Sequence, residues 1–159
     1  MGVSAKTRAK RTLEKRSDSY LFRIEQVIPS YSFGTNEGRL SVGLYSEYHH
    51  TEIESVCLSP KRFDGRPTRF TLLATRQITR DLEALYAGEQ TRFGVGTLTF
   101  RGSQSSYLGS IPFDAAVPIP GLILAGAYQF IYLSGDAMSH GTASIRYLAM
   151  HHSYDPDDL

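Results

Sequence analysis

The feature that most constrains the fold is a period of two in apolar and polar residues, repeated in short segments about ten residues apart. Tyr20, Phe22 and Ile24 follow this period, and so does the segment 95–101. Successive side chains of a β-strand point to opposite faces, so this pattern predicts strands. We expect Pro29 to stop the pairing of the first strand. Further strands are predicted in segments 39–48, 51–58, 69–75, 107–111, 128–133 and 143–149.

The sequence therefore predicts a mainly β fold, either a sandwich or a partly open barrel of about seven to eight short strands. One short helix is expected between Thr79, which can cap it, and Gly88, which can close it. Ile78 and Leu82 give that helix an apolar stripe. A small α+β fold is the alternative. The predicted core contains Phe22, Ile24, Leu40, Val42, Leu44, Leu72, Leu98, Phe100, Phe130, Ile131 and Ile145.

Charge divides the 159 residues into three parts. A basic N-terminal arm, residues 1–17, carries a net charge of +5, and the rest of the chain carries −4. A single β-rich domain is expected over residues 18–152, and residues 153–159 form an acidic C-terminal tail. A basic arm beside a mildly acidic body predicts an acidic protein surface or a second copy of the chain as partner.

Two observations bear on the cellular compartment of the protein and on whether its chain spans a membrane. Cys57 is the single cysteine, and no apolar segment follows the basic start, so we expect a cytoplasmic protein. Residues 115–133 contain no charged side chain, and the length of this segment approaches that of a membrane-spanning helix. Pro118, Pro120 and Gly121 interrupt this segment, which favours a loop followed by a buried strand and no span.

Histidines are the first candidates for chemistry. Four of the five histidines occur in two adjacent pairs, His49-His50 and His151-His152, and the first pair has carboxylates close by. Two histidines and one carboxylate form a ligand set that zinc or non-haem iron accepts. A metal site built from one residue of each pair is therefore one hypothesis, although the spacing matches no short metal-binding motif.

Basic residues give the second hypothesis. Segment 61–80 holds six basic residues and one acid, Asp64, with Phe63 and Phe70 interleaved. Such a loop can contact phosphates and stack a base, or its arginines can pair with carboxylates of the body. The residues predicted to contact nucleic acid or an acidic partner are Lys6, Arg8, Lys10, Arg11, Lys15, Arg16, Lys61, Arg62 and Arg66.

Motifs of catalysis and cofactor binding do not occur in the chain. Gly94 and Gly96 form a Gly-x-Gly pair without the third glycine of a dinucleotide fingerprint, and no phosphate-binding loop or nucleophile elbow is present. The leading hypothesis is accordingly a non-enzymatic binding or protein-interaction module that uses no cofactor. A metal-binding protein or metal-dependent enzyme, and a nucleic-acid-binding protein, are the alternatives.

Overall fold

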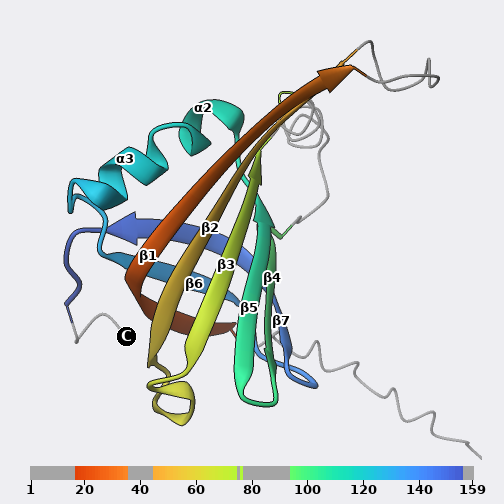
Figure 1. Cartoon of the computed structure of the whole chain (residues 1–159). Coiled ribbons are helices and arrows are strands. Elements are labelled where there is room, and N and C mark those ends of the chain that lie inside the picture. The colour runs from red at the N-terminus through yellow and green to blue at the C-terminus, as the bar shows by residue number, and fades with distance from the viewer. Residues whose placement is uncertain (1–16, 36–44, 75, 77–93, 156–159) are drawn as a thin grey trace, which may run out of the picture.

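The computed structural model describes residues 17–35, 45–74, 76 and 94–155, in which seven strands form a closed barrel. Neighbouring strands follow the order β1-β2-β3-β5-β4-β7-β6, and β6 pairs with β1 to close the ring. Figure 1 shows the long strands β1 and β2 rising above the rest of the barrel. The prediction of a mainly β fold is confirmed, with one correction: the barrel is closed, where the sequence predicted a partly open barrel or a sandwich.

The strands differ widely in length. They are β1 (Ser17–Thr35), β2 (Tyr45–Ser59), β3 (Pro67–Ala74), β4 (Gly96–Arg101), β5 (Gln104–Ser110), β6 (Phe130–Asp136) and β7 (Thr142–His151). All neighbours are antiparallel except β3 and β5, which are parallel, and the chain that connects this pair contains β4. β1 and β2 have 19 and 15 residues, so the expectation of uniformly short strands is wrong for this pair.

Alternate side chains fill the barrel interior. The Phe70 ring centroid lies 4.9 Å from that of Phe22 and 5.1 Å from that of Tyr107, and all three residues are fully buried. Six predicted core residues are buried: Phe22, Leu72, Leu98, Phe100, Ile131 and Ile145. Ile24 is partly buried against this core, whereas Leu40, Val42 and Leu44 lie outside the described residues. Phe130 was wrongly placed, because the inward residues of β6 are Ile131 and Leu133.

The ends of the barrel are covered by short helices. The uncharged segment 115–133 contributes to helices α2 (Phe113–Ala116) and α3 (Ile119–Leu124), which lie at the upper end in Figure 1, and then enters β6. Phe113 and Ile119 belong to the buried core. The 3₁₀ helix η1 (Lys61–Phe63) lies at the opposite end. In the described part of the chain, no helix has both the length and the apolar character that crossing a membrane requires.

Pro29 does not stop β1, which corrects the sequence prediction. The register of β1 and β2 runs through it, with Pro29 opposite Thr51, and continues to Thr35 opposite Tyr45. Proline has no N–H, so it is tolerated in a strand where that position faces an unpaired edge. β6 pairs with β1 only from Ser17 to Arg23, which leaves the later part of β1 with β2 as its one neighbour among the described strands. The helix predicted between Thr79 and Gly88 lies outside the described residues.

Candidate functional site: a tyrosine pocket on the barrel wall

A pocket of about 310 Å³ lies on the outer wall of the barrel, where β1, β6 and β7 adjoin the chain after β7. Its floor is Leu21, which is 1% exposed although it points away from the barrel core. The described residues around it are aromatic and polar: Tyr132, Tyr147, His151, Ser153, Tyr154 and Asp155. None of these lining residues is a lysine or an arginine.

Strand pairing places the first two tyrosines beside each other. Tyr132 stands opposite Leu21 of β1, and Tyr147 stands opposite Ser134 of β6. Tyr132 and Tyr147 are therefore diagonal neighbours on the outer face, a distance that aromatic side chains can bridge. Their ring centroids are 6.1 Å apart and the ring planes meet at 67°. This tilted arrangement presents the face of one ring beside the edge of the other.

Local contacts hold the other walls of the pocket. The hydroxyl groups of Tyr132 and Ser19 are hydrogen-bonded at 2.8 Å, which fixes the outer end of the Tyr132 ring. Tyr154 packs edge-on against Phe130, with ring centroids 4.9 Å apart. Phe130 thus supports the residues after β7 rather than the core. The sequence predicted an acidic tail from residue 153, and residues 153–155 of that tail form one side of the pocket.

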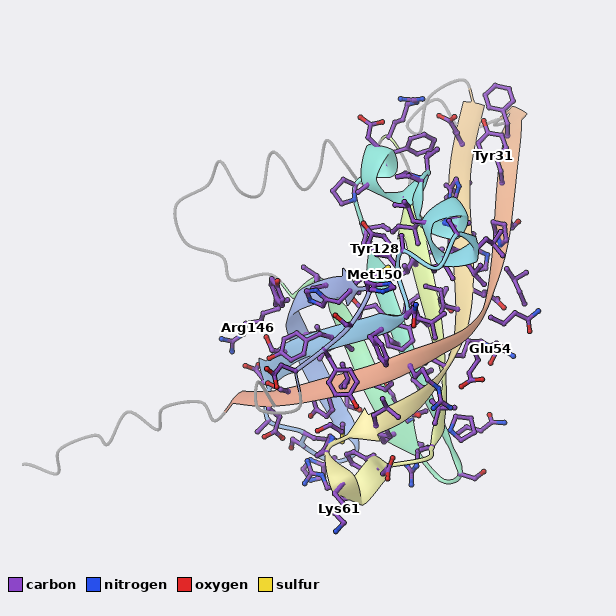
Figure 2. The ribbon with its side chains drawn as sticks, turned by 90° about the vertical axis from the view of Figure 1, so that its left-hand side faces the viewer. Tyr31, Glu54, Lys61, Tyr128, Arg146 and Met150 are labelled. Atoms are coloured by element: carbon purple, nitrogen blue, oxygen red, sulfur yellow. The ribbon has the colours of Figure 1, made fainter. Side chains whose placement is uncertain are left out.

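Charge near the pocket is negative or already paired. Asp155 is one of the lining residues, and the guanidinium of Arg146 forms an ion pair with Asp136 on the same outer wall. Figure 2 shows Arg146 pointing away from the barrel. Ser153 and His151 both line the pocket.

The two histidine pairs lie in separate parts of the barrel. The ring of His49 packs against Phe113 at 6.3 Å, and His50 Nε2 lies 3.6 Å from Glu52 Oε1. His151 and His152 follow at the end of β7, a strand that is no neighbour of β2. Within the described residues, no group of three or more His, Cys, Asp or Glu side chains could hold a metal ion. The structure therefore brings no histidine of the first pair to the second.

The basic residues of the predicted contact loop are found at the end of the barrel near η1. Phe63 stacks on Phe100 with ring centroids 3.9 Å apart, and the guanidinium groups of Arg62 and Arg66 lie 4.9 and 5.4 Å from the Phe63 centroid. Arg62 also pairs with Asp18 at 3.4 Å. One face of Phe63 is thus occupied by protein, whereas stacking a base needs an open ring face.

The other basic residues of segment 61–80 and of the N-terminal arm are considered by their positions in the chain. Lys61 is exposed at this end of the molecule (Figure 2). Further along, Arg69 pairs with Glu54 at 2.8 Å and Arg76 with Glu47 at 2.9 Å. These pairs match the alternative in which arginines bind carboxylates of the body. The basic arm residues Lys6, Arg8, Lys10, Arg11, Lys15 and Arg16 lie outside the described residues, and their contact with nucleic acid or an acidic partner stays a prediction.

Comparison with known proteins gives no relative, because no family model, no curated protein and no solved structure matches this chain. The function of the site is therefore inferred from its geometry. Sequence reasoning missed the tyrosine pocket. Its signal was the set of outward-facing tyrosines of the last two strands, with Tyr154 just beyond them.

Proposed function

We propose that this protein is a non-enzymatic protein-interaction module, and that the tyrosine pocket holds a lysine or arginine side chain of a partner protein. The observation that carries the proposal is the composition of the pocket. Three tyrosines and the carboxylate of Asp155 surround an apolar floor, and no described lining residue is a lysine or an arginine. An anionic group would meet neither of these cations among the lining residues, whereas a cation would meet several favourable groups.

The physical basis is the attraction between a cation and aromatic rings. A guanidinium or ammonium group over a tyrosine ring gains about 0.5–1 kcal/mol at an exposed site. The aliphatic stem of lysine or arginine can lie along apolar surface while its charged end stays in contact with water. Leu21 supplies that apolar surface, and the carboxylate of Asp155 lines the same pocket. A volume of about 310 Å³ is at the lower limit for ligand pockets, which suits one side chain.

The test is a titration of the full chain followed by NMR, with the Leu21 methyl groups as the reporter of the pocket floor. The probes are N-acetyl-arginine methylamide, N-acetyl-lysine methylamide and, as an uncharged match, N-acetyl-norleucine methylamide. We expect saturable shifts with dissociation constants of about 1 mM for the two cationic probes, since a few weak contacts contribute. The norleucine probe should bind several-fold more weakly.

Tyr147→Ala is the variant that probes the site, because Tyr147 is 53% exposed and its removal leaves the core intact. Tyr48→Ala is the matched control, since Tyr48 is 49% exposed and lies on β2, away from the pocket. We expect Tyr147→Ala to abolish saturation and Tyr48→Ala to retain it. Equal binding of norleucine and arginine probes would refute the cationic ligand, and absence of any saturable shift would refute the pocket as a binding site.

A further inference from the structure

The arrangement of the aromatic rings in the tyrosine pocket narrows the class of cation that it can hold. Tyr132 and Tyr147 both line the pocket, with ring centroids 6.1 Å apart and ring planes that meet at 67°. A group that lies between them therefore meets two ring surfaces that are not parallel. Tyr154 adds a third ring, which is held by its edge-on contact with Phe130. The ligand that fits best is one that presents positive charge in more than one direction.

Arginine and unmodified lysine each use this arrangement incompletely. A guanidinium group is planar and stacks on the face of one ring, so it meets a second ring at 67° at a steep angle. The ammonium group of lysine is compact and strongly hydrated, and it loses water when it approaches an apolar floor such as Leu21. The hydroxyl of Tyr132 is already hydrogen-bonded to that of Ser19 at 2.8 Å, so this tyrosine offers mainly its ring.

Methylation of the lysine nitrogen changes each of these properties in the favourable direction. The positive charge is kept, while each methyl group replaces an N–H donor and adds apolar surface that gains from leaving water. The charged end becomes rounded, so it can contact rings that face in different directions. An ammonium group is about as large as a water molecule, about 30 Å³, so a pocket of about 310 Å³ has room for the methyl groups beside the lysine stem.

We propose that the ligand of the tyrosine pocket is a methylated lysine side chain of a partner protein. This inference rests on the proposed function and goes beyond it, because it selects one among the cationic side chains. The methylated ammonium group lies between the rings of Tyr132 and Tyr147, where the attraction between cation and aromatic ring acts from two sides. The aliphatic stem lies along Leu21, and the carboxylate of Asp155 in the same lining favours a positive charge over a neutral group.

The test is an NMR titration of the full chain that follows the Leu21 methyl groups. The probes are the N-acetyl methylamides of lysine, dimethyl-lysine and trimethyl-lysine, together with a neutral match in which a tert-butyl group replaces the trimethylammonium group. Both methylated probes should bind at least about fivefold more tightly than lysine, since one fully buried methyl group is worth about fourfold. The neutral match should bind about threefold more weakly than trimethyl-lysine, because it lacks the charge. Choline, which lacks the lysine stem, should also bind more weakly than trimethyl-lysine.

Two variants test whether the aromatic ring is the source of the preference. Tyr147→Leu removes a ring and keeps an apolar side chain at a position that is 53% exposed, and Tyr48→Leu makes the same change on β2, away from the pocket. Tyr147→Leu should lower the preference for trimethyl-lysine over its neutral match by at least about twofold, and Tyr48→Leu should keep it. A preference that Tyr147→Leu leaves unchanged would overturn the proposal.

The probes also separate this proposal from the proposed function. If the methylated probes bind no more tightly than lysine, or if the neutral match binds as tightly as trimethyl-lysine, the inference of a methylated lysine is wrong. Choline that binds as tightly as trimethyl-lysine would overturn lysine as the source of the ammonium group. In each of these cases, saturable binding of the lysine and arginine probes would leave the proposed function standing. Absence of saturable binding by every probe would refute both proposals.

Discussion

The two halves of β1 have similar sequences and different environments. In the first half, residues 17–23 pair with β6 and residues 21–24 pair with β2, and Tyr20, Leu21 and Phe22 are at most 1% exposed. In the second half, residues 26–35 pair with β2, and Ile28 and Tyr31 are exposed. Both halves carry aromatic and aliphatic residues. The difference shows that the burial of an apolar residue in this strand depends on the elements packed against it, so the first half should contribute more to stability than the second.

The largest expected effect comes from removing an aromatic ring from the first half. Phe22 is fully buried and packs edge-on against Phe70. Phe22→Ala should lower the free energy of unfolding by about 3–5 kcal/mol, because it leaves a cavity in the packed interior. Tyr31→Ala in the second half should cost less than about 1 kcal/mol, since it removes an exposed ring and one exposed hydrogen bond to Glu47. Urea unfolding of both variants measures the contrast, and equal losses would contradict it.

This contrast also marks the limit of what the sequence predicted. The period of two located β3, β4, β6 and β7 to within a few residues, because one face of each strand is buried in the barrel. It could not show that β1 passes through Pro29, since that depends on which edge of the strand is unpaired. Phe130 also fits a period of two, but it belongs to the outer face of β6 and not to the inner one. Its ring packs against Tyr154, a contact that depends on the position of the chain after β7.

The candidate site was less predictable than the fold. Tyr132 and Tyr147 become neighbours through the pairing of β6 and β7, which includes a register shift at Gly135. The pocket then needs Tyr154 and Leu21, from opposite ends of the chain. Histidine pairs and basic clusters can be recognised in a sequence, so the predicted metal site and the predicted contact surface were based on them. For a pocket assembled from four separate segments, the linear chain offers only the tyrosines of the last two strands and Tyr154 as a signal, and these do not show that Leu21 joins them.

A smaller effect is expected from added methyl groups at two glycines. Gly109 lies under the ring of Tyr107, and a Cβ there would come within 2.6 Å of Tyr107 Cε1. Tyr107 cannot move freely, because its hydroxyl donates a hydrogen bond to the Val95 carbonyl oxygen at 3.0 Å. Gly109→Ala should therefore cost about 1–3 kcal/mol through overpacking.

Gly34, in the second half of β1, is the matched control for Gly109. A Cβ at Gly34 meets nothing within 4 Å. Gly34→Ala should stabilise the protein by about 0.4–1 kcal/mol, because alanine restricts the unfolded chain more than glycine does. Both values come from the midpoints and slopes of urea unfolding curves. A loss at Gly34 as large as that at Gly109 would mean that the second half of β1 is packed like the first.

The last expected difference concerns the tyrosines of the two halves at alkaline pH. Burial raises the pKa of Tyr20 to about 12, with the Asp18 carboxylate acting in the same direction and Arg62 in the opposite one. The hydrogen bond to Glu47 is the main cause that raises the pKa of Tyr31, whose side chain is exposed. The first shift comes mainly from the folded core and the second from one surface neighbour, so only the first should couple strongly to folding.

For Tyr20, the unfolded chain loses its proton near pH 10, whereas the folded protein keeps it until about pH 12. Stability is thus lost as pH rises between these values, by at most about 1.4 kcal/mol per pH unit. Urea unfolding at several pH values from 9 to about 12 should show this fall, and Tyr20→Phe should make it shallower by up to that slope. Tyr31→Phe should leave the slope nearly unchanged. If both variants flatten the profile equally, the two halves of β1 do not differ in their coupling to folding.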